Sequence, residues 1–590
     1  MEKPIYILGI SCYYHDASAA LLKDGVVVAA AQEERFTRKK HDPSFPVHAI
    51  QFCLSSERID INAIQYIGFY EKPLLKFERV LSQHLEMFPW SLKTFVTSMP
   101  SWIGEKLWVI RTIRKKLKYK GGVLFIEHHM AHAASAFLIS PFARAALVTA
   151  DGVGEWTTTT YGIGEGNDIR LLQEIKFPHS LGLLYSAITA YLGFSVNNSE
   201  YKVMGLAASG SMDRSANPYY SKFKEIIDVK DDGSFRLNME YFTYHYADHM
   251  LSRKLCEFLG GPVRMPEQEI SDRHKDIAAA LQLIFEDVQI KILQHVYRAT
   301  GCENLVIAGG CGLNSSFNGK IIRNTSFKRV WTQPDPGDGG TSIGAASYIY
   351  HTLLGNKRNF ILETAYLGPE YSDQEIKIFL SENKIKYSQF QDEAALIKEA
   401  AKLICGNKVV GWFQGRMEWG PRALGARSIL ANPGNPKAKE ILNAKVKHRE
   451  KFRPFAPAVC SEDAEKYFVC DSPLPAATDF MLMVYPIKPE WREKIPSVTH
   501  VDGSGRLQTV KRGQNFRYHD VIKAVGAGSG IPIIINTSFN IRGEPIVCSP
   551  YDAYKCMMGT GIDCLIMGSF LIKREDNLIH EWDSEKYAKD

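Results

Sequence analysis

The chain has 590 residues, more than a single hydrophobic core usually serves, which excludes a one-domain protein. Its 45% hydrophobic, 23% charged and 11% aromatic residues exclude a disordered or collagen-like chain. The net charge of +6 is small for this length, so we expect no general affinity for nucleic acid or membranes, and any basic site must be local.

The N-terminal part alternates short apolar runs with helical patterns, which predicts an α/β architecture. Three strands are predicted first, at residues 5–10, 17–22 and 26–32. The dipeptide Asp24-Gly25 between the second and third predicts a tight type I′ hairpin turn. A similar series recurs at residues 145–150, 156–163 and 169–175. We therefore expect an internal duplication.

Two further strands, at residues 305–308 and 330–332, each lead into a glycine-rich turn. Glycines let backbone amides approach a ligand, and the N-terminus of a following helix favours negative charge. Two halves, each with a hairpin sheet and a glycine-turned loop, resemble the actin/hexokinase-type ATP-binding folds.

The sequence between residues 356 and 393 is polar and lacks glycine loops, so it is the predicted junction between a domain at 1–355 and a domain at 394–590. The second domain is also predicted to be α/β, with a helix ending at Cys405, a strand near 409–413 and a late strand at 532–536. The polar, glycine-rich residues 490–530 are predicted to form loops over a site.

A candidate metal site begins with His128 and His132, which are spaced to lie one turn apart on one helix face. Asp151 and Asp338 each follow a predicted strand and precede glycine. Together the four side chains would form a His₂Asp₂ set that suits a divalent ion such as iron or zinc. The alternative is a pair of capping or core histidines.

A candidate anion site contains three arginines among glycines, Arg416, Arg422 and Arg427. Four basic residues follow: Lys447, Arg449, Lys451 and Arg453. Arginine binds phosphate or carboxylate oxygens bidentately, so a converging set suits a small polyanion. The late strand leads into Asn536, Ser538 and Asn540, whose polar groups would complement it. The alternatives are a solvated basic face and a plain Asx turn.

His15 follows the first predicted strand and is a candidate general base, because imidazole titrates near neutral pH. It could equally cap the hairpin.

The eleven cysteines are scattered, odd in number and contain no C-x-x-C pair, which favours reduced thiols over a disulfide framework. No apolar run approaches the length of a membrane span, and the first run lacks signal-peptide features. We expect a cytoplasmic protein without a membrane partner.

Taken together, these motifs resemble the O-carbamoyltransferases of natural-product biosynthesis, the family of the tobramycin, cephamycin and nodulation-factor enzymes. The matching strings cover nearly the whole chain in order: residues 14–16, 33–42, 128–135, 151–155, 201–205, 309–314, 337–340, 415–427, 451–457 and 536–544.

The resemblance implies an actin-like N-terminal domain related to the tRNA threonylcarbamoyl-transfer proteins and a C-terminal YrdC-like domain. The C-terminal domain would convert carbamoyl phosphate and ATP, with Mg²⁺, into carbamoyl-adenylate. The N-terminal domain would transfer the carbamoyl group to a hydroxyl of a small-molecule acceptor.

The resemblance also implies roles for individual residues. A divalent metal, with Fe(II) the expected ion, would be held by His128, His132, Asp151 and Asp338. The nucleotide would contact Lys40, Gly310 and Asn314. Carbamoyl phosphate and the ATP phosphates would be held by Arg422, Lys447, Arg453, Arg506, Asn536, Ser538 and Asn540. His15 would take the proton from the acceptor.

Three other functions compete with this interpretation: a tRNA-modifying enzyme of the same fold, an actin-like ATPase or chaperone with structural histidines, and a sugar or glycerol kinase that releases ADP. Only carbamoyl transfer uses both the metal set and the C-terminal arginine set. The identity of the acceptor is not predicted, and a homodimer is expected on frequency alone.

Overall fold

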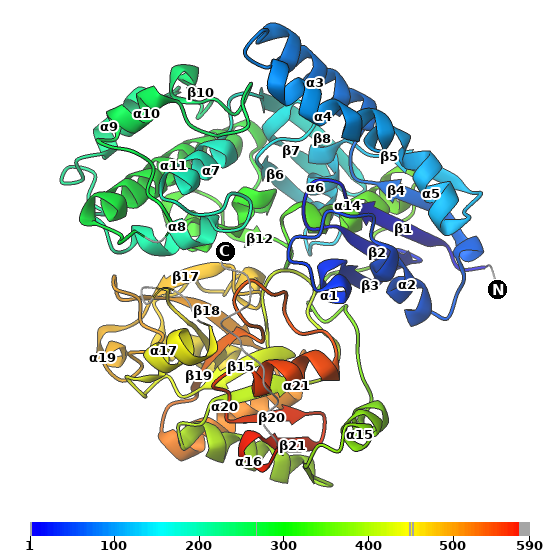
Figure 1. Ribbon diagram of the computed structural model, residues 1–590, viewed down its shortest axis with the longest axis vertical. Coiled ribbons are helices and arrows are strands. Elements are labelled where there is room, and N and C mark those ends of the chain that lie inside the picture. The colour runs from blue at the N-terminus through cyan, green and yellow to red at the C-terminus, as the bar shows by residue number, and fades with distance from the viewer. Residues whose placement is uncertain (1–2, 267, 448–449, 451–452, 578–590) are drawn as a thin grey trace. The chain divides into compact units, whose positions relative to one another are not determined.

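The computed structural model describes residues 3–577 except 267, 448–449 and 451–452 (Figure 1). The chain forms two compact units. The first comprises residues 1–33, 43–314 and 320–362, and the second comprises residues 34–42, 315–319 and 363–590. Residues 34–42 and 315–319, which fall within the predicted first domain, therefore belong to the second unit. Helix α15 (Asp373–Glu382) lies within the predicted junction and is also part of the second unit.

Two five-stranded sheets form the centre of the first unit. The first sheet has the order β3-β2-β1-β4-β5, with β1 (Tyr6–Ser11), β2 (Ser18–Lys23), β3 (Val26–Gln32), β4 (Ile64–Phe69) and β5 (Gly122–Phe125). The second has the order β12-β11-β6-β7-β8, with β6 (Arg144–Ala150), β7 (Thr157–Glu165), β8 (Asp168–Lys176), β11 (Asn304–Ala308) and β12 (Arg329–Trp331).

The two sheets repeat one topology. In each, the first three strands form an antiparallel meander, and two later strands add in parallel beside the first. This confirms the predicted duplication and the actin/hexokinase-type arrangement. The predicted hairpin turn is also present, because Asp24 and Gly25 have φ angles of 50° and 84°.

Helices α6 (His128–Phe137) and α14 (Thr341–Ser347) pack against each other between the two sheets (Figure 1). Each helix packs on the sheet of the other half: α6 follows β5 but contacts β6, β7 and β11, while α14 follows β12 but contacts β1, β2 and β4. Half of α6 and nearly all of α14 are small residues, and a Cβ atom on Gly344 would lie 1.9 Å from the Ala131 carbonyl oxygen. The close crossing therefore requires glycine at position 344.

The remaining helices of the first unit lie around this centre. They are α2 (Val47–Ser56), α3 (Pro73–Glu86), α4 (Leu92–Gly104), α5 (Val109–Leu117), α7 (Leu181–Tyr191), α8 (Glu200–Ala207), α9 (Tyr220–Ile226), α10 (Arg253–Phe258), α11 (Asp272–Thr300) and α13 (Ile321–Asn324). The long helix α11 packs against α7, α8 and α9 and against β6 and β7. A two-stranded sheet, β9 (Ile227–Val229) and β10 (Phe235–Leu237), completes the unit.

The second unit is a mixed α/β domain, as predicted. Its nine-stranded sheet has the order β13-β21-β20-β14-β15-β19-β16-β18-β17. The strands are β13 (Ser388–Gln389), β14 (Val410–Phe413), β15 (Arg427–Ala431), β16 (Ala456–Cys460), β17 (Met483–Pro486), β18 (Ser504–Val510), β19 (Ile533–Ser538), β20 (Cys564–Met567) and β21 (Phe570–Lys573). The helices are α1 (Glu34–Thr37), α12 (Ser315–Asn318), α15, α16 (Glu393–Cys405), α17 (Ala438–Ile441), α18 (Ala464–Tyr467), α19 (Pro489–Arg492), α20 (Phe516–Ser529) and α21 (Pro550–Met558).

One prediction for this unit is wrong. Residues 490–530 are not mainly loops, because they contain the buried strand β18 and the helix α20. Helix α20 packs against α16, and both contribute to a core that includes Trp412, Leu430 and Ile534. Tertiary packing thus outweighs the polar, glycine-rich composition.

All eleven cysteines are free thiols, as predicted. Among the described residues, no helix has both the length and the apolarity needed to cross a bilayer.

The substitution Gly344→Ala is expected to lower the free energy of unfolding by about 3 kcal/mol, because its methyl group would overlap the Ala131 carbonyl of the helix opposite. Thermal unfolding measures the change. The control is Gly104→Ala, where an added Cβ meets nothing within 4 Å and the change should stay within about 1 kcal/mol. Equal stability of the two variants would contradict the tight helix crossing.

Candidate metal centre

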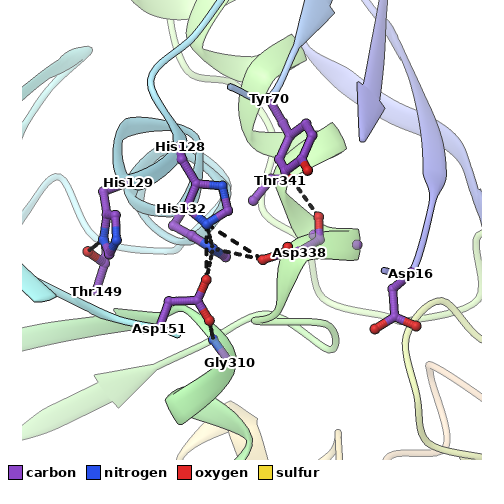
Figure 2. Close-up of polar contacts among 12 residues, drawn as sticks. Asp16, Tyr70, His128, His129, His132, Thr149, Asp151, Gly310, Asp338 and Thr341 are labelled. Carbon is purple, nitrogen blue, oxygen red and sulfur yellow. Dashed lines mark hydrogen bonds and ion pairs between the residues drawn. The ribbon is translucent and has the colours of Figure 1, made fainter. Parts of the chain in front are cut away.

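Four predicted side chains converge in the first unit (Figure 2). Helix α6 presents His128 and His132 one turn apart, Asp151 directly follows β6, and Asp338 lies in the turn before α14. The Nε2 atoms of the two histidines are 3.1 Å apart. Asp151 Oδ2 lies 3.0 Å from His128 Nε2 and 3.4 Å from His132 Nε2. Asp338 Oδ1 lies 3.6 and 3.5 Å from the same two nitrogens.

The pKa values in this cluster are shifted because two carboxylates pack against two imidazoles away from solvent. Burial alone would raise the pKa of Asp151, but hydrogen bonds to His128 and His132 hold it well below its usual range. Burial opposes protonation of His132, yet Asp151 and Asp338 raise its pKa to about 9. The cluster therefore attracts positive charge strongly.

A divalent cation fits these residues. One ligand atom from each of the four lies within 4.8 Å of the other three. The Oδ1 atom of Asp338 is buried and has no hydrogen-bond partner among the described residues, although it faces both histidines. A buried carboxylate oxygen without a donor is costly unless a cation satisfies it. Two imidazole and two carboxylate ligands suit ions of the iron and zinc kind.

The third histidine of the motif, His129, has a different role. Its Nε2 donates to the Thr157 carbonyl at 2.9 Å, so its Nδ1 accepts from the Thr149 hydroxyl at 2.6 Å. Burial, together with the neighbouring His128 and His132, lowers its pKa well below the usual value. His129 is thus a neutral residue that fixes α6 onto β6 and β7.

His15 lies beside the cluster and is linked to it through Asp338. Its Nε2 is 3.8 Å from Asp338 Oδ2, and its Nδ1 is 3.0 Å from Asp16 Oδ2. Burial would lower its pKa, but Asp338 and Asp16 raise the pKa of His15 to about 10. The imidazole can accept a proton near neutral pH only when the charge of these carboxylates is compensated.

Gly310 and Asn314 lie in the glycine turn after β11. The Gly310 amide donates to Asp151 Oδ1 at 3.0 Å, so this turn orients a predicted metal ligand (Figure 2). The Asn314 amide exchanges two hydrogen bonds with Gln282 of α11, at 3.0 and 3.1 Å. Lys40, the third predicted nucleotide contact, is half-buried and belongs to the second unit.

The second unit brings three of the predicted anion-site residues together. The buried ammonium of Lys447 donates to Ser538 Oγ at 3.3 Å and to Asn540 Oδ1 at 2.7 Å. It also donates to the backbone carbonyls of Ser538 and Asn540. The three protons of this ammonium thus have acceptors at the end of β19, and a role of its positive charge in binding an anion stays a prediction.

The other predicted residues of this unit have contacts of their own. Arg453 forms an ion pair with Glu450 at 3.6 Å, and Arg506 lies on β18 opposite Val484. The side chain of Asn536 is buried and donates to the Ala423 carbonyl and Gln508 Oε1. Arg422 is half-buried in the arginine-rich loop. Arg449 and Lys451 lie outside the described residues.

Two arginines of the loop bind backbone carbonyls of their own unit. Arg416 donates to the carbonyls of Leu367 and Gly368. The fully buried Arg427 stacks on Phe413, with 3.7 Å from its guanidinium carbon to the ring centroid, and donates to three backbone carbonyls. Among the three loop arginines, Arg422 is therefore the one that we still predict to bind an anionic ligand.

Comparison with known proteins identifies the family. Residues 6–347 match the family model described as Carbamoyltransferase N-terminus, and residues 401–574 match the one described as Carbamoyltransferase C-terminus. The chain belongs to the carbamoyltransferase family. The resemblance seen in the motifs is thereby confirmed.

Relatives of this carbamoyltransferase cover most of its length. It is 44% identical over 605 residues to the uncharacterized protein sll1178 of Synechocystis sp., covering 96% of this chain and 97% of that protein. It is 35% identical over 582 residues to the nodulation protein NolNO of Sinorhizobium fredii, covering 97% and 80%. A solved structure, component A of (R)-2-hydroxyglutaryl-CoA dehydratase from Acidaminococcus fermentans, is 13% identical with a TM-score of 0.32, covering 59% of this chain and 99% of that chain.

Two glutamates of the carbamoyltransferase support the site residues, and the sequence reasoning did not single them out. The Glu155 carboxylate accepts from the His128 amide at 3.1 and 3.2 Å and from the Lys72 amide at 2.8 Å, so it holds the first turn of α6. In the second unit, Glu418 Oε1 accepts from the amides of Leu424, Ala426 and Arg427 and folds the arginine-rich loop around itself. Glu155 is 27 residues away from His128 in the chain, so no local sequence pattern marks this contact.

The substitution His132→Ala is expected to remove one cation ligand and to weaken binding of Fe(II) or Zn(II) at least about 100-fold. Metal analysis after dialysis should then show a loss from about one ion per chain to almost none. The control is His249→Ala, which changes an exposed histidine paired with Asp248. Unchanged metal content in His132→Ala would show that the four side chains do not form a metal site.

Proposed function

We propose that this carbamoyltransferase is an ATP-dependent O-carbamoyltransferase acting on a hydroxylated small natural product. One observation supports this above the others: the chain contains two polar clusters suited to two different steps. The first unit has a cation-attracting His₂Asp₂ cluster beside His15, and the second has the Lys447–Ser538–Asn540 cluster. A kinase or a plain ATPase would require one phosphate-transfer site only.

The second unit would form the activated carbamoyl group. Hydrolysis of carbamoyl phosphate releases phosphate and carbamate. A carbamate oxygen then attacks the α-phosphorus of ATP with Mg²⁺, the bond to the β-phosphate oxygen breaks, and pyrophosphate leaves. Lys447, held by Ser538 and Asn540, would offset negative charge that develops on phosphate oxygens, together with Arg422, Arg453 and Arg506.

The first unit would transfer the group. The acceptor hydroxyl oxygen attacks the carbamoyl carbon of carbamoyl-adenylate, the bond from that carbon to the AMP oxygen breaks, and AMP leaves. His15 would accept the hydroxyl proton at Nε2, while Asp16 holds its Nδ1. Gly310 would position Asp151, and Asn314 would fix the glycine turn near the nucleotide through Gln282.

A divalent metal, which we propose to be Fe(II), would be held by His128, His132, Asp151 and Asp338. Such an ion supplies charge stabilisation for the bound nucleotide oxygens and polarises a carbonyl. Lys40 would contact the nucleotide, and Asn536 would belong to the residues that hold the phosphates. We also propose a cytoplasmic location, because the free thiols of all eleven cysteines agree with a reducing compartment.

A product assay with ATP, carbamoyl phosphate and Mg²⁺ should give AMP and pyrophosphate only when carbamoyl phosphate is present. The substitution Lys447→Met should lower pyrophosphate formation about 100-fold or more, because it removes a fixed positive charge that would offset charge on the phosphate oxygens. Lys437→Met is the matched control, since Lys437 is exposed close by in the chain. ADP as the product, or pyrophosphate formed equally without carbamoyl phosphate, would contradict the proposal and favour a kinase or an ATPase.

The substitution His15→Ala should separate the two steps. We expect carbamoylation of a hydroxylated acceptor to fall about 100-fold or more, because the proton acceptor is lost. Exchange of labelled pyrophosphate into ATP, which needs only the second unit, should stay within a factor of about two of the parent rate. An equal loss of both activities would indicate that His15 is not a base for the transfer step.

A further inference from the structure

The connection between β4 and β5 is an unusual surface of the first unit. It contains α3, α4 and α5, which lie at the outer edge of that unit (Figure 1). Ten of the 22 exposed large apolar side chains among the described residues belong to it: Leu74, Leu75, Leu85, Phe88, Trp90, Leu92, Val96, Ile103, Trp108 and Ile110. We call this set, with the basic segment described next, the α3–α5 surface.

The loop joining α3 to α4 is the most exposed apolar part of this surface. Phe88 is 65% exposed and Trp90 is 76% exposed, while the neighbouring Leu85 is 67% exposed. Phenylalanine and tryptophan bury the largest apolar areas, so their exposure together is costly unless a partner covers them. The buried residues Trp102 and Met99 hold α4 in place and leave these side chains outside.

The same surface is strongly basic. Residues 106–120 contain seven lysines and arginines, and no aspartate or glutamate occurs between Glu105 and Glu127. Six of the seven are exposed: Arg111, Arg114, Lys115, Lys116, Lys118 and Lys120. The segment alone carries more positive charge than the net +6 of the whole chain. Helix α5 buries Val109 and Ile113 and exposes Ile110 with the basic residues.

We infer that the α3–α5 surface binds peripherally to an anionic lipid bilayer. Phe88, Trp90 and their apolar neighbours would enter the interface, and the cations of α5 would meet lipid phosphates. Clusters of four to eight basic residues beside exposed aromatic and aliphatic side chains have this preference. The inference replaces the expectation of no membrane partner, and it involves no membrane-spanning helix.

Charge and apolar exposure together favour an anionic bilayer over a second copy of the chain or a nucleic acid. Two copies of the surface would repel each other, because its six exposed cations outnumber the three exposed acids, Glu78, Glu86 and Glu105. Nucleic acid would satisfy the cations, but its outer phosphate surface would leave most of the exposed leucine, valine and isoleucine side chains uncovered. An anionic bilayer supplies both phosphate and hydrocarbon.

Sedimentation of the full-length protein with lipid vesicles tests the inference. We expect binding to phosphatidylcholine vesicles that contain phosphatidylglycerol, weak binding to phosphatidylcholine alone, and loss of binding at high salt. The double substitution Lys115→Gln/Lys116→Gln should lower the partition coefficient about 30-fold, because each basic residue contributes about fivefold. The double substitution Phe88→Ser/Trp90→Ser should lower it about tenfold or more.

Matched controls are Lys377→Gln/Lys398→Gln and Leu172→Ser, which change exposed side chains outside the surface and should bind as the parent does. Each variant should keep the parent's melting temperature and its carbamoyl-phosphate-dependent pyrophosphate formation. The inference is overturned if the parent protein does not bind anionic vesicles, or if the surface variants bind them as strongly as the parent does. It is also overturned if the same substitutions abolish binding to RNA or self-association while vesicle binding is unchanged.

Discussion

The arrangement of the first unit depends on the Asp151 carboxylate. One of its oxygens faces the Nε2 atoms of His128 and His132, and the other accepts the Gly310 amide. It thus ties the end of β6 to helix α6 and to the glycine turn after β11. Two imidazoles and two carboxylates at such short range are stable only when their charges are balanced, either by shared protons or by a cation.

The duplicated fold explains how distant parts of the chain meet at this place. Each half sends one small-residue helix across to the sheet of the other half, and the two helices cross at Gly344. Helix α6 therefore delivers its histidines to the end of β6, and α14 brings Asp338 to the same point from the opposite direction. Small residues in both helices are a requirement of the site as well as of packing.

The strands and the duplication could be predicted from periodicity, and the pairing of His128 with His132 from helical spacing, because both are local signals. The meeting of Asp151 and Asp338 with these histidines depends on the fold, and it was implied by the resemblance of the motifs to a known family. The structural roles of Arg416 and Arg427 were not predictable, since they depend on carbonyls of residues 367–369. Glu155 and Glu418 act through backbone amides, which leave no pattern in the sequence. Strand β18 was missed because its pairing with β16 and β17 is a tertiary interaction.

We propose that one carbamoyl group passes through a mixed anhydride with AMP, which links the two polar clusters in one reaction. The most direct test supplies carbamoyl phosphate with heavy oxygen in its carbonyl group and measures the mass of the AMP released on transfer to an acceptor. The two carbamate oxygens are equivalent, so about half of the AMP should carry one heavy oxygen. AMP without the label, at full turnover, would show that carbamoyl-adenylate is not the intermediate.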